Sequence, residues 1–164
     1  MAGRKNAQRE RRLLSEYLAI ARPKQRVIFN ARLGPVALQS PGALPVGIPP
    51  QVFSNSQMYS DAVVFGDGYV EIWEAKGVLD GRAIGQLLEY ELALRQSPDF
   101  VEFRNEPAKL EIVCAVARPT AVALAKQLNI EVHFYAPAWI VQDFASWYTN
   151  LQQPILAASA TVHP

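Results

Sequence analysis

Hydrophobic and polar positions recur along the chain with two different periods, which divide it into short elements. Apolar residues at three- and four-residue spacing predict helices, and apolar, β-branched and aromatic runs predict strands. Proline, glycine and asparagine mark several boundaries. The expected elements are a helix at 4–21, a strand at 25–33, a hairpin at 60–76, a helix at 81–95, a strand at 110–117, a helix at 119–128, a strand at 130–135 and a helix at 138–151.

This order of elements predicts a protein of the α/β class, with a mixed β-sheet flanked by helices. The first three strands should form an antiparallel group, and the strand, helix and strand of residues 110–135 imply a right-handed parallel crossover. A chain of 164 residues is long enough for one domain with a proper core. We expect that domain to occupy residues 1–151, with a flexible tail at 152–164.

Residues 34–57 interrupt the periodic pattern. Five prolines and three glycines fall in this stretch, and no regular element survives such a proline density. Long segments without secondary structure are uncommon in compact domains and are often functional or flexible. The stretch could form a substrate flap, a partner-docking loop or an ordered surface excursion.

The hairpin is the clearest local signal in the sequence. An Asp-Gly pair within Gly66-Asp67-Gly68 separates two apolar runs, which is typical of a tight β-turn. We expect Phe65 to pair with Tyr69 across this turn. That pairing would bring Asp61, at the start of the first strand, opposite Trp73 or Glu74 near the end of the second strand.

Three charged side chains would then converge at one end of the hairpin. Glu74 and Lys76 are two residues apart on a strand and therefore point to the same face. Two carboxylates, from Asp61 and Glu74, suit a hard divalent cation such as Mg²⁺, which binds oxygen ligands and phosphates. Such a cation can activate water for attack on a phosphodiester, with Lys76 orienting the water or offsetting charge. The alternative is a salt bridge between Glu74 and Lys76 on a solvated strand face.

Taken together, these motifs and their order resemble those of the PD-(D/E)XK nuclease superfamily. That family has an αβββαβ core, with an acid opening the second core strand and an acid-x-Lys pair on the third. Asp61 matches the first acid, although Ser60 stands where the family often has proline, and Glu74-Ala75-Lys76 matches the second motif. Residues 86–90 further resemble the Gln-x-x-x-Tyr helix motif of the RecB-like branch.

The resemblance implies a restriction-endonuclease-like fold and a Mg²⁺- or Mn²⁺-dependent nuclease acting on DNA. Asp61 and Glu74 would bind the metal and Lys76 would assist the nucleophile. Gln86 and Tyr90 would support the site from the following helix. The family often adds a glutamate from the first helix, for which Glu16 is the first candidate and Glu10 the second.

Charge is distributed unevenly along the chain. Residues 1–32 contain nine Lys or Arg against two Glu, whereas the rest contains seven against thirteen acids. A basic arm suits a polyanion, because neutralising phosphates releases counterions; the alternative is a solubilising helix face. The candidate nucleic-acid contacts are Arg4, Lys5, Arg9, Arg11 and Arg12.

Several other classes of function are disfavoured. The single cysteine, Cys114, excludes an internal disulfide and a cysteine-rich zinc site, and its apolar neighbours predict a buried thiol. No apolar run is long enough for a membrane span and no signal-like segment follows the basic N-terminus. We expect a soluble cytoplasmic protein, or a virion-associated one if it is encoded by a phage. His133 and the three tryptophans are expected to be structural.

Two functional hypotheses follow. The first is a metal-dependent DNA nuclease with the residues named above. The second is a catalytically idle module of the same fold that serves in an assembly, such as a phage particle or a DNA-processing complex, as a homo-oligomer or with protein partners. The small size of the chain and its apolar-rich extensions at 34–57 and 138–164 motivate the second hypothesis.

Overall fold

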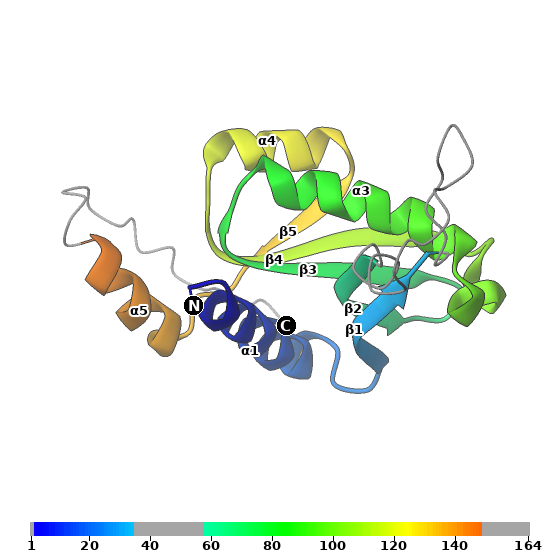
Figure 1. The fold of residues 1–164 in the computed structure, drawn as a ribbon, viewed down its shortest axis with the longest axis horizontal. Helices are drawn as coiled ribbons and strands as arrows, with labels where there is room; N and C mark the ends of the chain where they lie inside the picture. The colour runs from blue at the N-terminus through cyan, green and yellow to red at the C-terminus, as the bar shows by residue number, and fades with distance from the viewer. Residues whose placement is uncertain (1, 35–57, 149–164) are drawn as a thin grey trace, which may run out of the picture. The chain divides into compact units, whose positions relative to one another are not determined.

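A computed structural model describes the backbone of residues 2–34 and 58–148, with side chains at 6–34 and 58–144 (Figure 1). The protein is of the α/β class, with a five-stranded mixed sheet flanked by helices, which confirms the predicted class. The elements are α1 (Ala2–Ala21), β1 (Arg26–Leu33), β2 (Met58–Phe65), β3 (Val70–Leu79), α3 (Gly81–Gln96), the 3₁₀ segment η1 (Pro98–Phe103), β4 (Ala108–Ala117), α4 (Pro119–Gln127), β5 (Ile130–Phe134) and α5 (Ala138–Tyr148).

The strands are arranged in chain order, β1-β2-β3-β4-β5, so that β3 is the central strand. β1 pairs antiparallel with β2, and β2 pairs antiparallel with β3, as predicted. The proline-rich stretch at 35–57 and the tail at 152–164 lie outside the described residues. Among the helices that are described, none is both long enough and apolar enough to span a bilayer.

The hairpin forms where the sequence predicts it, but its pairing differs by one residue. Phe65 pairs with Val70 rather than with Tyr69, and the following pairs continue to Ala62 with Trp73. The loop therefore has four residues, closed by a hydrogen bond from the Gly66 amide to the Tyr69 carbonyl at 3.0 Å. Gly68 has a φ of 72°, a conformation that glycine adopts without steric cost. The predicted pair of Phe65 with Tyr69 is thus wrong, because the turn needs one more residue.

Contacts divide the chain into two compact units. The hairpin unit contains residues 25–34, 58–73 and 85–110, and the α1 unit contains residues 2–24, 74–84 and 111–148. Strands β3 and β4 and helix α3 each contribute residues to both units. Each unit buries its own set of apolar side chains.

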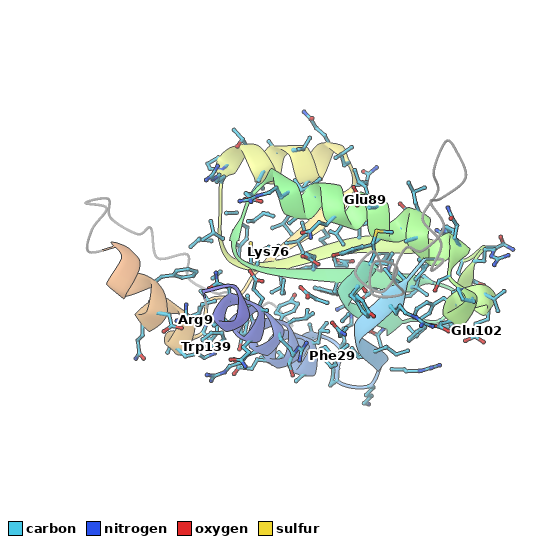
Figure 2. The ribbon with its side chains drawn as sticks, in the orientation of Figure 1. Arg9, Phe29, Lys76, Glu89, Glu102 and Trp139 are labelled. Atoms are coloured by element: carbon cyan, nitrogen blue, oxygen red, sulfur yellow. The ribbon has the colours of Figure 1, made fainter. Side chains whose placement is uncertain are left out.

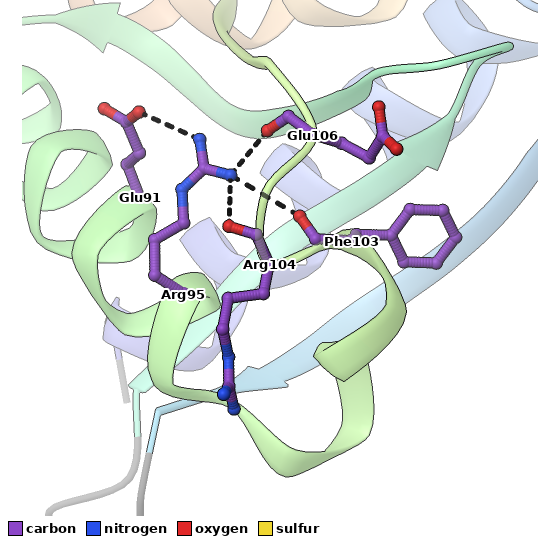
Figure 3. A network of polar contacts seen from close by, with 5 residues as sticks. All are labelled: Glu91, Arg95, Phe103, Arg104 and Glu106. Carbon is purple, nitrogen blue, oxygen red and sulfur yellow. Dashed lines mark hydrogen bonds and ion pairs between the residues drawn. The ribbon is translucent and has the colours of Figure 1, made fainter.

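The hairpin unit is organised around aromatic rings and one arginine. Phe65 lies 6.1 Å from Phe100 and 4.7 Å from Phe103, measured between ring centroids. Arg95, in the last turn of α3, donates to the carbonyls of Arg104 and Glu106 at 2.9 and 2.5 Å (Figure 3). These carbonyls belong to the loop that follows the 3₁₀ segment. Arg95 supplies their hydrogen-bond donors and so fixes the loop beside the helix.

The α1 unit is built on apolar residues of its first helix. Leu13, Leu14 and Leu18 recur at helical spacing and are buried. Figure 1 shows α1 (blue) and α4 (yellow) on opposite sides of β4 and β5. On the α1 side the ring of Tyr17 lies 5.4 Å from that of His133 and 5.7 Å from that of Tyr135.

Helix α3 begins after a capping residue, Asp80. The Asp80 carboxylate accepts a hydrogen bond from the Arg82 amide at 3.0 Å, which satisfies one of the donors that the first helical turn leaves open. The same carboxylate forms an ion pair with the Arg82 side chain, which is almost fully exposed. The cap therefore carries more of the stabilisation than the ion pair does.

We predict that Asp80→Ala lowers the free energy of unfolding by about 1 kcal/mol, because the helix loses its capping acceptor. Asp80→Asn keeps a side-chain oxygen at the same place and should cost only a few tenths of that amount. Urea denaturation followed by circular dichroism measures both, with Asp67→Ala in the exposed turn as a control. Equal losses for the alanine and asparagine variants would contradict a capping role.

Candidate functional site

The candidate site is centred on β3, where an acid and a lysine share one face of the strand. Glu74 is only 3% exposed, and its Oε1 lies 2.5 Å from Nζ of Lys76. The Lys76 side chain is 22% exposed, so it lies at the edge of the buried region. The two side chains thus share one face and form the salt bridge of the alternative interpretation, but Glu74 is buried and not on a solvated face.

A buried carboxylate is costly unless it is paired. β3 is otherwise apolar around Glu74, with Ile72, Trp73 and Ala75 fully buried. Lys76 therefore supplies a charge that offsets the desolvation of Glu74. This arrangement holds the two functional groups in one orientation.

The opposite face of β3 holds a second buried acid that the sequence analysis missed. Glu71 is fully buried, and its Oε2 accepts a hydrogen bond from Nε1 of Trp73 at 2.9 Å. The spacing of two residues on a strand places both on one face. A Trp two residues after an acid in an apolar run is a usable signal for such a pair. Trp73 is therefore structural, as expected.

Asp61 lies in β2 and is partly buried. It belongs to the hairpin unit, while Glu74 and Lys76 belong to the α1 unit. The last pair of the β2–β3 ladder is Ala62 with Trp73, one residue after Asp61 and one residue before Glu74. The convergence of Asp61 with Glu74 and Lys76 stays a prediction.

The two residues of the Gln-x-x-x-Tyr motif lie in α3, as predicted, but in different environments. Tyr90 is buried on the helix face that also buries Leu87 and Leu94. Gln86 is exposed. Tyr90 is thus part of the core of the hairpin unit, and Gln86 has its polar group in solvent.

The two acids considered in α1 also differ. The Glu16 carboxylate accepts a hydrogen bond from Nε1 of Trp139 at 2.8 Å and pairs with Nε of Arg12 at 2.8 Å. The Trp139 hydrogen bond, followed by that of Arg12, lowers the pKa of Glu16. Glu16 therefore links α1 to α5. Glu10 instead lines a cavity beside the end of β3.

That cavity has a volume of about 410 Å³ and lies within the α1 unit. Gly77 and Val78, which directly follow Lys76, form part of its wall. A Cβ atom on Gly77 would lie 3.1 Å from Cζ of Phe144, so glycine permits the close approach of α5. The charged residues of its lining are Arg9, Glu10, Asp80, Arg82, Arg118 and Asp143.

The basic residues of α1 are only partly available to a ligand. Nε of Arg9 lies 2.9 Å from Oδ2 of Asp143, and the Arg12 guanidinium lies 4.4 Å from the Trp139 ring centroid (Figure 2). Arg11 is exposed. The side chains of Arg4 and Lys5 lie outside those described. Among the predicted nucleic-acid contacts, Arg9 and Arg12 thus also hold α5 in place.

The single cysteine behaves as predicted. Cys114 is fully buried in β4, and this burial raises the pKa of its thiol to about 12. A thiol that stays protonated at neutral pH is not a nucleophile. Cys114 therefore contributes to the core.

The donor chemistry of the predicted site fits a hard divalent cation. Carboxylate oxygens are the ligands that Mg²⁺ and Mn²⁺ prefer, and one or two of them suffice when water and phosphate complete the shell. Asp61 and Glu74 are both carboxylates at strand positions of fixed backbone. No protein-family model matches the chain, and no curated protein is significantly similar to it.

We predict that Lys76→Met lowers the free energy of unfolding by on the order of 3 kcal/mol, because Glu74 loses its ammonium partner while remaining buried. The double variant Glu74→Gln/Lys76→Met removes both charges and should recover most of that loss. Chemical denaturation at neutral pH measures the cycle, with Lys109→Met as a control at another lysine. Additive effects of the two substitutions would contradict a coupled buried pair.

We also predict a pH-dependent contribution from Glu16. Its lowered pKa means that the ionised form is stabilised in the folded protein, so the contribution is present above the ordinary value of 4.5 and is lost as pH falls through the folded pKa. Glu16→Gln should therefore destabilise the protein at pH 7 and progressively less below about pH 4.5. The difference in unfolding free energy, measured from pH 3 to 7, tests this, with the exposed Glu102→Gln as control. A difference independent of pH would contradict the ion-pair role.

Proposed function

We propose that the protein is a metal-dependent DNA nuclease with a restriction-endonuclease-like fold. The observation that carries the proposal is the buried Glu74 carboxylate bonded to Lys76 at 2.5 Å on the central strand. A buried acid and a lysine on one strand face provide a fixed metal ligand and a fixed cation beside it. The order of helices and strands around this pair supports the same fold.

Asp61 and Glu74 would hold the Mg²⁺ or Mn²⁺ ion. Bound there, the ion would supply a water of lowered pKa and stabilise charge on the phosphate. The antiparallel pairing of β2 with β3 supports this assignment, because its last pair joins Ala62, next to Asp61, with Trp73, next to Glu74. Each acid lies on a strand, whose regular backbone would limit the movement of its carboxylate.

Lys76 would orient the attacking water and offset the negative charge that develops on the phosphate. Its ammonium group contacts Glu74 and could also donate hydrogen bonds to a water and to a phosphate oxygen. In the hydrolysis, the water oxygen bonds to phosphorus and the bond to the leaving sugar oxygen breaks. Lys76 would thus act through charge and position.

The remaining residues would position the DNA and the metal ligands. Glu10 is a better candidate than Glu16 for the acid from α1, because Glu10 lines the cavity beside β3 and Glu16 is engaged with Trp139. Gln86 is exposed and can reach a ligand, whereas the buried Tyr90 would brace the helix. Arg118, an exposed residue of the cavity lining, would contact a phosphate.

An assembly module is the second candidate function. Leu92 and Val101 in the hairpin unit are 67% and 59% exposed, which leaves apolar surface on both α3 and η1. In addition, Arg9, one of the predicted nucleic-acid contacts, is paired with Asp143 within the protein and is therefore less available to DNA. A homo-oligomer or a protein partner that covers this surface would favour the assembly role.

The proposed activity is tested by incubating the full chain with plasmid, linear and branched DNA in Mg²⁺ or Mn²⁺. We expect cleavage that EDTA abolishes and that Asp61→Asn and Lys76→Met each slow by roughly 10²–10³-fold, because each removes a group that acts on the transition state. Circular dichroism at the assay temperature would establish that both variants are folded.

Matched control variants distinguish the loss of a site residue from the general effect of removing a charge. Asp67→Asn and Lys109→Met change the same residue types at other positions, both in the hairpin unit, and should leave cleavage unchanged. Glu10→Gln should slow cleavage more than Glu16→Gln does. The absence of cleavage on every substrate, or full activity in Lys76→Met, would refute the nuclease and leave the assembly role, which light scattering at several concentrations tests.

A further inference from the structure

A second group of metal-binding side chains lies on β4 and β5. One ligand atom from each of Glu111, Glu131 and His133 lies within 4.8 Å of the other two. All three residues belong to the α1 unit. The group has no residue in common with the candidate nuclease site.

The positions of these residues on two neighbouring strands explain why their side chains meet. Glu131 and His133 are two residues apart on β5 and so point to the same face, while Glu111 lies on the neighbouring strand β4. On that face the ring of Tyr17 packs against the imidazole of His133. The α1 helix thus fixes the histidine from one side.

Burial differs strongly among the three residues. The Glu111 side chain is only 2% exposed, and its Oε2 lies 2.7 Å from Nε2 of His133, whose side chain is 17% exposed. Glu131 is 69% exposed, and its Oε1 lies 3.9 Å from the same nitrogen. The group therefore extends from a deeply buried carboxylate, through a mostly buried imidazole, to an exposed carboxylate.

The two distances from Nε2 of His133 lie on either side of the ligand-to-ligand separation in a four-coordinate metal site. With metal–ligand bonds near 2.0–2.1 Å, tetrahedral ligands lie roughly 3.3 Å apart. The 2.7 Å contact would have to open and the 3.9 Å contact to close, each by roughly 0.6 Å on that tetrahedral geometry. Rotation of the exposed Glu131 side chain and a small shift of His133 would make these two adjustments, and the ligand atoms of Glu111 and Glu131 already lie within 4.8 Å of each other.

We infer that Glu111, Glu131 and His133 form a binding site for a divalent transition metal, zinc in particular. An imidazole nitrogen with two carboxylates is a ligand set that suits Zn²⁺, whereas Mg²⁺ prefers oxygen ligands alone. A metal binds the unprotonated imidazole nitrogen and the ionised carboxylates, so any proton on these ligand atoms passes to solvent on binding. The inference does not rest on the proposed nuclease function.

Three protein ligands leave one position of a tetrahedral metal open. Glu131 is at the solvent-facing side of the group, and β5 is the end strand of the described sheet, so a water molecule can complete the coordination. The metal would connect the end strand to β4 through side chains as well as through the backbone ladder. Binding should therefore stabilise the folded chain.

The test is titration of the full chain with Zn²⁺ by calorimetry, together with the visible absorption of Co²⁺ as a spectroscopic substitute. We expect one Zn²⁺ per chain, a Tm that rises with Zn²⁺ concentration, and Co²⁺ bands of a four- or five-coordinate site. Glu131→Gln, an exposed substitution that should not affect folding, is expected to weaken Zn²⁺ binding by about tenfold or more, as is His133→Asn.

Two control variants make the result specific to these residues. The chain has two histidines, so His163→Gln should leave Zn²⁺ affinity unchanged if His133 is the ligand. Glu74→Gln should also leave it unchanged, which separates this site from the candidate nuclease site. The inference is overturned if the chain binds no Zn²⁺, if Glu131→Gln and His133→Asn bind it as tightly as the parent, or if His163→Gln abolishes binding.

Discussion

The burial of one carboxylate on the central strand is the constraint on which the rest of the candidate site depends. Removing Glu74 from water costs several kcal/mol, and the charge of Lys76 offsets part of that cost only if the two groups are held together. Apolar residues of equal volume would give a core that is at least as stable. A charged pair in the middle of the sheet is therefore not needed for stability, which is why we propose a chemical role for it.

The elements of the fold could be predicted from local patterns, because each is set by nearby residues. The Asp-Gly turn and the proline that begins α4 each act within a few positions, and both lie where the sequence places them. The pairing of Phe65 was wrong by one residue, since turn length depends on backbone geometry that Gly66-Asp67-Gly68 does not determine alone. Leu92 fits the apolar pattern of its helix and is nevertheless exposed.

The parts of the candidate site that sequence could not predict depend on residues distant in the chain. Glu16 was the first choice in α1, yet its carboxylate contacts Trp139, 123 positions later, while Glu10 lines the cavity beside β3. His133 is expected to be structural from its strand position, and the structure places Glu111 2.7 Å from it and adds Glu131 to a group that could hold a metal ion. Neither arrangement corresponds to a short sequence motif, because pairing of strands and contacts between helices bring the residues together only after folding.

The most direct test of the central claim is a crystal structure of the protein soaked in Mn²⁺, with the anomalous difference map calculated at the manganese edge. The account predicts a peak bonded to the carboxylates of Glu74 and Asp61, with Lys76 beside it. A map with no peak at Glu74, whether or not manganese binds at Glu111, Glu131 and His133, would contradict the assignment of this pair as a metal-dependent nuclease site.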